Sequence, residues 1–187
     1  MGFVADEPRG RRQGDGSNAS GGVALIHRRR RDDPGGPVAH DARWPLELDP
    51  EFRSFSRRDP FVDIVRESVA SYADGLADRA SRHWHDDIVW RVPGSNPPSG
   101  QHVGADAIFE YHRELQRLTN GTFRQRLLSL EGSQGPLIEA YLRTSARRGE
   151  RRLDIPTLVI FELQFGHVRV VSELPGDQSE WDEFWAG

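Results

Sequence analysis

The chain of 187 residues contains no cysteine and no lysine. Without cysteine there is no disulfide, no thiolate nucleophile and no cysteine-ligated zinc, and nothing in the composition points to an oxidising compartment. The 25 basic residues are all arginines, which excludes mechanisms that depend on a lysine imine or on a lysine base of lowered pKa.

Long apolar runs are missing as well. The longest, at 23–26 and 158–161, are far shorter than the roughly 20 residues needed to cross a bilayer, and shorter than the apolar part of an export signal. The net charge of −4 does not favour a broadly basic, nucleic-acid-binding surface. We therefore expect a cytoplasmic protein that associates with neither membranes nor nucleic acids.

Residues 1–58 are rich in Gly, Arg, Asp, Ser and Pro and include the stretches GDGSNASGG and RRRRDDPGGP. Such a composition cannot bury enough apolar surface to fold. Arginines 28–31 are followed at once by two aspartates, which favours a solvated tail over a basic binding segment. We predict a disordered N-terminal tail over 1–58 and one folded domain over 59–187.

The periodicity of apolar residues predicts helices in the first part of this domain. Asp59-Pro60 marks a helix start, and apolar residues follow at helical spacing towards Gly75. A second short helix is expected from 76 to about 85, and a strand at 87–92 that ends at Pro93-Gly94. A loop at 93–100 and a third helix at 104–118 complete this half.

Four stretches rich in β-branched and apolar residues follow, at 122–130, 138–146, 152–163 and 168–174, with glycine-containing turns between them. They predict sequential antiparallel strands. Residues 177–185 form a short amphipathic helix with Trp181, Phe184 and Trp185 on its apolar side. This order predicts an α+β fold, in which an antiparallel sheet curls around helices packed on one face.

The order of the elements and three motifs resemble the SnoaL-like polyketide cyclase family of the nuclear transport factor two-like superfamily. The motifs are HDDIVWRVPGSNPPSG at 85–100, GADAIFEY at 104–111 and ELPGDQSEWDEFW at 173–185. The resemblance implies a cone-shaped curved antiparallel sheet wrapped around about three helices, also described as a cystatin-like α+β barrel. It further implies a pocket for a small apolar or carbonyl-bearing ligand, no cofactor, and a homodimer that pairs through the sheet face.

The chemistries of the superfamily match this sequence incompletely. Steroid-isomerase chemistry needs a carboxylate base, a neutral acid and a tyrosine. The corresponding positions hold Arg91, Val159 and Ser68. Many SnoaL-like sequences carry a histidine at the first two of these positions, and this sequence departs from that pattern too. The acid/base set of the known isomerases and cyclases is therefore absent.

Epoxide hydrolases of this fold use an Arg-x-Asp strand motif and a second aspartate near the last strand. Arg152-Leu-Asp154 and Glu173 resemble this arrangement at first sight. Counted back from Phe161, however, the positions that should match are Ala140 and Leu142. An epoxide hydrolase-like enzyme is thus an alternative that rests mainly on analogy of fold.

The candidate site consists of polar and aromatic residues expected near the pocket. The catalytic candidates are Arg91, Asp154 and Glu173; if Arg91 faces inward, it needs a carboxylate partner, and Glu173 is the expected one. The pair would be an anion or carbonyl clamp, or merely structural, and Arg91 could equally point to solvent. The ligand-binding candidates are Trp90, Tyr111, Tyr141, Thr157 and Val159, although Trp90 also fits a core position.

The histidines do not predict a metal site. His83 and His85, with two aspartates after them, lie at i and i+2, and such side chains diverge on a helix, so a surface helix end is favoured. His112 on the third helix is expected to face solvent. The leading hypothesis is a SnoaL-like protein that binds a small organic molecule and acts as a cyclase or isomerase with a non-standard acid/base set. A non-catalytic ligand-binding or dimerisation module is the alternative of equal weight.

Overall fold

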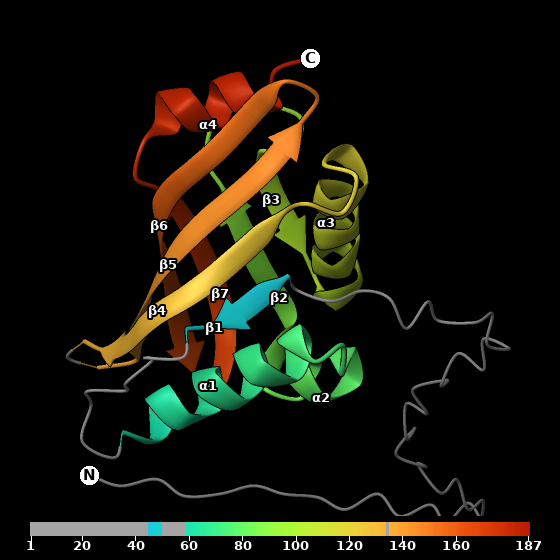
Figure 1. The fold of residues 1–187 in the computed structure, drawn as a ribbon. Coiled ribbons are helices and arrows are strands. Elements are labelled where there is room, and N and C mark those ends of the chain that lie inside the picture. Colours follow the sequence, from blue (N-terminus) through green and yellow to red (C-terminus); the bar gives the residue numbers. More distant parts are fainter. Residues whose placement is uncertain (1–44, 50–58, 134) are drawn as a thin grey trace, which may run out of the picture. The chain divides into compact units, whose positions relative to one another are not determined.

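A curved, open sheet of seven strands lies at the centre of the fold (Figure 1). The computed structural model describes residues 45–49, 59–133 and 135–187. The strands are β1 (Leu46–Leu48), β2 (Trp84–Val92), β3 (Gly100–Val103), β4 (Arg124–Gly132), β5 (Leu137–Arg148), β6 (Arg151–Gln164) and β7 (His167–Pro175). The helices are α1 (Pro60–Ala73), α2 (Ala77–Ser81), α3 (Ala105–Leu118) and α4 (Gln178–Trp185).

The strands lie in the order β1-β4-β5-β6-β7-β2-β3. Neighbouring strands are antiparallel, except that β1 runs parallel to β4 and β2 runs parallel to β7. The parallel pairing places β2, which comes early in the chain, directly beside the last strand. It therefore brings the motif around Trp90 next to the motif that begins at Glu173.

Alternation along the long strands separates an inner from an outer face of the sheet. Every second residue of β6 from Leu153 to Leu163 is buried, and the residues between them are exposed or half-buried. Because successive side chains of a strand point to opposite faces, this pattern fixes the odd-numbered residues of β6 on the inner face. The inner face is the one that the helices cover.

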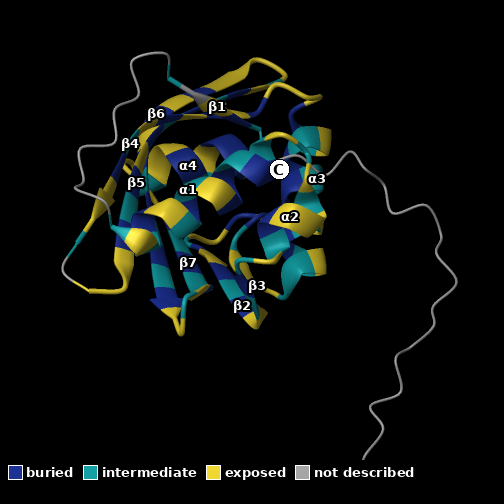
Figure 2. Cartoon of the chain, turned by 90° about the horizontal axis from the view of Figure 1, so that it is seen from below, coloured by how far each residue is buried: buried dark blue, intermediate teal, exposed yellow. Residues whose placement is uncertain are grey.

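Each helix is held by its apolar side. Pro60 occupies the first turn of α1, and the side chain of Asp59 accepts a hydrogen bond from the Phe61 N–H at 2.9 Å, as favoured at a helix start. Helix α1 contacts β4 and β5, α3 contacts β2 and β3, and α4 contacts β6 and β7. Figure 2 shows that the buried residues gather where the helices meet the sheet, so the core lies between these two layers.

The predicted α+β fold with a curved antiparallel sheet is confirmed, and helices α1, α3 and α4 lie within a few residues of their predicted bounds. The described residues form the four helices that the residue pattern predicts, whereas the resemblance implied about three. The predicted second helix is too long, since α2 ends at Ser81 and β2 already begins at Trp84. Trp84 is held in the strand because its indole N–H donates to Ser68 Oγ at 2.7 Å and its ring packs on Tyr72.

Two strands were not predicted. Strand β3 takes up the end of the predicted loop and pairs with β2. Strand β1 lies inside the range predicted to be disordered, and it pairs with β4 at 46–48. Apart from 45–49, the predicted tail at 1–58 lies outside the described residues. None of the described helices is both long and apolar enough to cross a membrane.

Candidate functional site

A buried carboxyl group, that of Glu173, is the centre of the polar interior. Its side chain is 2% exposed. Oε2 accepts hydrogen bonds from Trp90 Nε1 at 3.2 Å and from Tyr111 Oη at 2.5 Å, and Oε1 accepts one from Gln125 Nε2 at 2.9 Å. These donors come from β2, α3 and β4, so three separate elements converge on one carboxyl group.

The register of the sheet explains why Glu173 points inward. On β7 it lies two residues after the buried Val171, and it pairs with the fully buried Val159 of β6. The same parity places Trp90, which lies beside Val171, on the inner face of β2. Two residues predicted for the ligand pocket, Trp90 and Val159, thus flank Glu173 on either side.

Burial raises the pKa of Glu173, while the hydrogen bonds from Tyr111, Gln125 and Trp90 act in the opposite direction. The net direction is upward, because removing a carboxylate from water outweighs the three donors. The pKa of Tyr111 is also raised, first by its own burial and then by the nearby Glu173. The phenol therefore keeps its proton and donates a hydrogen bond to the carboxyl group.

A chain of polar side chains continues from Glu173 across the inner face of the sheet. Gln125 Nε2 lies 3.4 Å from Thr144 Oγ1, which in turn lies 2.7 Å from Thr157 Oγ1. All three side chains are buried. Buried polar groups are stable when they hydrogen-bond to one another, and here they form one connected network with the carboxyl group at its end.

His112 was expected to face solvent, and this expectation is wrong. Its side chain is buried between sheet and helices, with Nδ1 at 2.9 Å from Tyr72 Oη and at 3.0 Å from the Ile108 carbonyl oxygen. Its ring packs edge-on against Trp90 at 5.0 Å. Burial lowers the pKa of His112 to about 3, so the imidazole is neutral at physiological pH.

A second histidine connects the network to the surface. His102 of β3 is half-buried and stacks on the ring of Tyr111 at 4.4 Å. Its Nε2 lies 3.2 Å from the Pro98 carbonyl oxygen, in the loop that precedes β3. His102 of the four-residue edge strand β3 therefore covers one face of the Tyr111 ring.

The predicted clamp between Arg91 and Glu173 is not formed. Arg91 is exposed on the outer side of β2, and Glu173 is bonded to Trp90, Tyr111 and Gln125 instead. The physical reason is the alternation of the strand: Trp90 faces inward, so the next residue must face outward. Arg91 is thereby removed from the interior site.

Two further candidates lie on the outer face of the sheet. Asp154 is exposed and forms an ion pair with Arg143 at 2.7 Å, and that arginine holds its pKa below the ordinary value. Tyr141 is also exposed and donates to Glu139 at 2.8 Å. Since Asp154 and Glu173 lie on opposite faces, the structure does not bring together the carboxyl pair of an epoxide hydrolase-like site.

The interior site is closed in this structure. Trp90, Tyr111, Gln125 and Glu173 are all nearly inaccessible to solvent, so a ligand that contacts Glu173 must displace part of the packing around it. Within the described residues, no group of three or more His, Asp or Glu side chains is placed to hold a metal ion. The chemistry that the arrangement offers is hydrogen bonding and proton exchange by one buried carboxyl group.

Comparison with known proteins finds relatives that span most of this chain. No family model matches the chain. An uncharacterized protein of Mycobacterium tuberculosis H37Rv is 26% identical over 129 residues, which cover 68% of this chain and 98% of that protein. The structure of Bal32a, from a soil-derived mobile gene cassette, is 30% identical, covers 67% of this chain and 96% of its own, and superposes with a TM-score of 0.62.

More distant structures identify the fold. A nuclear transport factor two-like protein from Burkholderia xenovorans is 18% identical over 67% of this chain and 95% of its own, with a TM-score of 0.57. A candidate polyketide cyclase from Xanthomonas campestris is 13% identical over 70% of this chain and 100% of its own, with a TM-score of 0.51. The fold of the chain is that of nuclear transport factor two-like proteins, as its SnoaL-like motifs predicted.

Proposed function

We propose that the chain is a cytoplasmic protein that binds a small, mostly apolar, carbonyl-bearing molecule inside the cone, next to Glu173. One observation carries this proposal: Glu173 is a buried carboxyl group on which donors from three elements converge. Buried carboxyl groups with shifted pKa values are concentrated at functional sites. The apolar residues around it, among them Val159 and Val171, suit a ligand with little polar surface.

The chemistry follows from the raised pKa of Glu173. A raised pKa makes the carboxylate a stronger base, and its protonated form can donate a hydrogen bond to a carbonyl oxygen, so the group can exchange a proton with an enol. His112 is a poor base because its pKa is lowered to about 3. We therefore assign proton transfer to Glu173, in a cyclase or isomerase reaction that lacks the histidine or aspartate of the known family members.

Access to Glu173 requires movement at the edge of the sheet. Strand β3 has four residues and pairs only with β2 among the described strands, and its His102 covers Tyr111. Short edge strands with few buried side chains open more easily than central ones. We propose that the ligand enters when β3 and the loop at 93–99 move away from α3.

The test is to identify the small molecules released from the full chain by mass spectrometry. We expect an apolar, carbonyl-bearing compound in the wild type, and about tenfold less of it in Glu173→Gln, because the amide NH2 group replaces an oxygen that accepts hydrogen bonds and the site around it is disrupted. Asp154→Asn, a matched change of an exposed carboxyl group, should retain the wild-type amount. Equal retention in Glu173→Gln, or no bound compound at all, would reject Glu173 as the site.

A second candidate function is that of a dimerisation module, and the outer face of the sheet favours it. Tyr141, Leu158 and Leu174 are cross-strand neighbours on β5, β6 and β7. Tyr141 and Leu174 are 39% and 42% exposed. Adjacent exposed apolar side chains on a sheet are typical of a surface that pairs with another copy.

We expect the wild type to sediment as a dimer and Leu174→Arg to sediment as a monomer at the same concentration. In a two-fold symmetric interface each substitution acts twice, because both copies place the same patch in contact. Leu76→Arg, at an exposed leucine between α1 and α2, should leave the dimer intact. Sedimentation of the wild type as a monomer at every concentration would contradict the sheet-face dimer.

A further inference from the structure

Two pairs of arginines lie opposite each other at the end of the β5–β6 hairpin. The register places Arg148 opposite Arg151 and Arg147 opposite Arg152, with a turn at 149–150 between the strands. Like charges directly opposite each other destabilise a pair of strands. A hairpin that carries two such pairs needs negative charge or carbonyl oxygens nearby.

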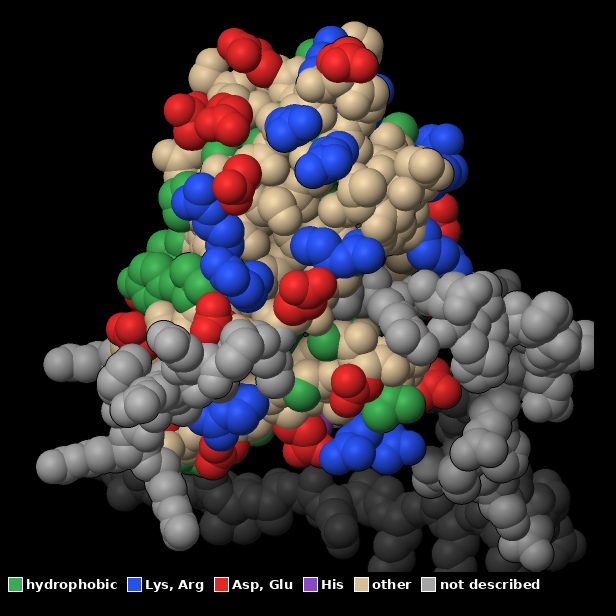
Figure 3. Space-filling model, in the orientation of Figure 1, with side chains coloured by type: hydrophobic (Ala, Val, Ile, Leu, Met, Phe, Trp, Pro, Cys, Tyr) green, Lys and Arg blue, Asp and Glu red, His purple; other side chains and the backbone are tan. Residues whose placement is uncertain are grey.

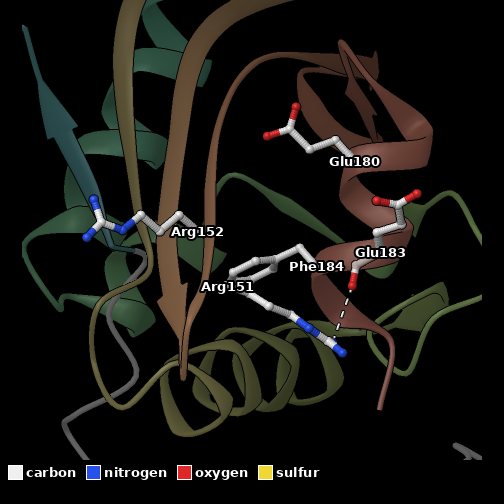
Figure 4. A pocket seen from close by; sticks show the side chains of 5 residues that line it. All are labelled: Arg151, Arg152, Glu180, Glu183 and Phe184. Carbon is white, nitrogen blue, oxygen red and sulfur yellow. Dashed lines mark hydrogen bonds between the residues drawn. The ribbon is translucent and has the colours of Figure 1, made fainter.

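The pair next to the turn is stabilised by helix α4. Nη1 of Arg148 donates to the carbonyl oxygens of Trp185 at 2.8 Å and Ala186 at 3.0 Å, and Nη1 of Arg151 donates to that of Glu183 at 3.3 Å. The last carbonyl groups of a helix have no partner within the helix and form the negative end of its dipole. Figure 4 shows Arg151 reaching towards α4 in this way.

The second pair has no such partner. Neither Arg147 nor Arg152 forms an ion pair with any residue that the structure describes. In Figure 4 the side chain of Arg152 points away from α4 and its Glu180 and Glu183. The acid nearest along β6, Asp154, is already bonded to Arg143 at 2.7 Å.

The two unpaired guanidinium groups line one surface hollow. Its volume is about 370 Å³, and its lining includes Arg147, Arg152 and Ser145, together with Thr122 and Asp154. The hydroxyl of Thr122 is hydrogen-bonded to backbone groups of residues 119 and 147. Ser145 Oγ has no hydrogen-bond partner within the described part of the chain. Figure 3 shows that basic side chains are spread over this face of the sheet.

We propose that Arg147, Arg152 and Ser145 bind the phosphate group of a small molecule. Two guanidinium forks present parallel N–H donors to a tetrahedral dianion, which at the same time removes the repulsion between them. The hollow has the size of a site for a small ligand. The net charge of −4 favours a compact anion over a long nucleic acid, which would meet the acidic remainder of the surface. The site is on the outer face and is independent of Glu173.

Titration calorimetry of the full chain with inorganic phosphate at low ionic strength tests the site. We expect saturable binding that weakens by about tenfold or more in Arg147→Gln and in Arg152→Gln, since each removes a charge-assisted hydrogen bond. Arg82→Gln, at an exposed arginine after α2, is the control and should bind as the wild type does. Raising the ionic strength with chloride should weaken binding through screening.

Thermal unfolding supplies a second readout. Without phosphate, Arg147→Gln should melt at or above the wild-type temperature, because it removes a like-charge contact. With phosphate, the wild type should gain stability and the double variant Arg147→Gln/Arg152→Gln should not. The proposal is overturned if phosphate does not bind the wild type, if chloride at equal ionic strength gives the same heat, or if the double variant binds as tightly as Arg82→Gln.

Discussion

Replacing Trp185 with alanine is expected to lower the free energy of unfolding by about 3–5 kcal/mol. Its side chain is fully buried, with ring centroids at 4.8 Å from Phe184, 5.6 Å from Trp181 and 6.1 Å from Phe123 of the segment leading into β4. Helix α4 has eight residues and is too short to be stable alone. Without the indole ring it loses much of the apolar side that holds it to the sheet, and a cavity remains.

Denaturant unfolding at constant pH measures this loss. Phe165→Ala is the control, since Phe165 is 90% exposed in the β6–β7 turn and should change the free energy of unfolding by less than about 0.5 kcal/mol. A loss below about 1 kcal/mol in Trp185→Ala would mean that α4 is not part of the cooperative core. Equal losses in the two variants would point to a general effect of removing an aromatic ring.

The predicted helices and strands that the structure confirms share one property. The pattern of their own residues is enough to identify them. Strands β5 and β6 have twelve and fourteen residues, rich in apolar and β-branched side chains and bounded by glycine-containing turns, and such a stretch is visible without any partner. Strands β1 and β3 carry no such signal. They have three and four residues, and only their pairing with β4 and β2 makes them strands.

Three of the site candidates could have been placed on the outer face from the sequence alone. If Trp90 faces inward, its neighbour Arg91 cannot, and if Thr157 faces inward, Asp154 lies on the opposite side of the same strand. Tyr141 lies between the apolar residues Ala140 and Leu142 and is excluded by the same rule. Residue type alone does not separate the two faces of a sheet, whereas the alternation along each strand does.

The partners of Glu173 could not be predicted in this way. Gln125, Tyr111 and Trp90 are 48, 62 and 83 residues away along the chain. Their convergence depends on the strand order and on the packing of α3 against β2. Gln125 had one usable signal, because it lies two residues before the buried Leu127 on a strand and so shares its face.

Acidification from pH 6.5 towards pH 3 is expected to remove up to about 5 kcal/mol of unfolding free energy through His112. The pKa of His112 falls from 6.5 to about 3, chiefly because the ring is buried and to a smaller extent because of the nearby His102, while the contact with the Ile108 carbonyl acts in the opposite direction. In the unfolded chain the imidazole takes up a proton below pH 6.5, and in the folded chain it does not. The unfolded state is therefore stabilised as the pH falls through this window.

Glu173 contributes with the opposite sign. Its pKa is raised in the folded state, so its contribution is fully present below about 4.5 and is lost as the pH rises through the raised value. The dependence of the wild-type unfolding free energy on pH contains both effects. The contribution of His112 is therefore isolated by subtracting the curve of a variant in which only that imidazole is missing.

His112→Asn is the suitable variant, because an amide at this position can still bond to Tyr72 and to the Ile108 carbonyl, which lie within 3.0 Å of Nδ1. We expect it to be less stable than the wild type at pH 7.5, since it loses the ring packing against Trp90. Below pH 6.5 the difference should shrink and then change sign, because the asparagine has no proton to take up. His167→Asn, at an exposed histidine, should follow the wild-type curve throughout. The contrary result is that the unfolding free energies of His112→Asn and the wild type run parallel between pH 6.5 and pH 4. His112 would then be protonated as readily in the folded protein as in the unfolded chain, and the interior around Glu173 would be open to water.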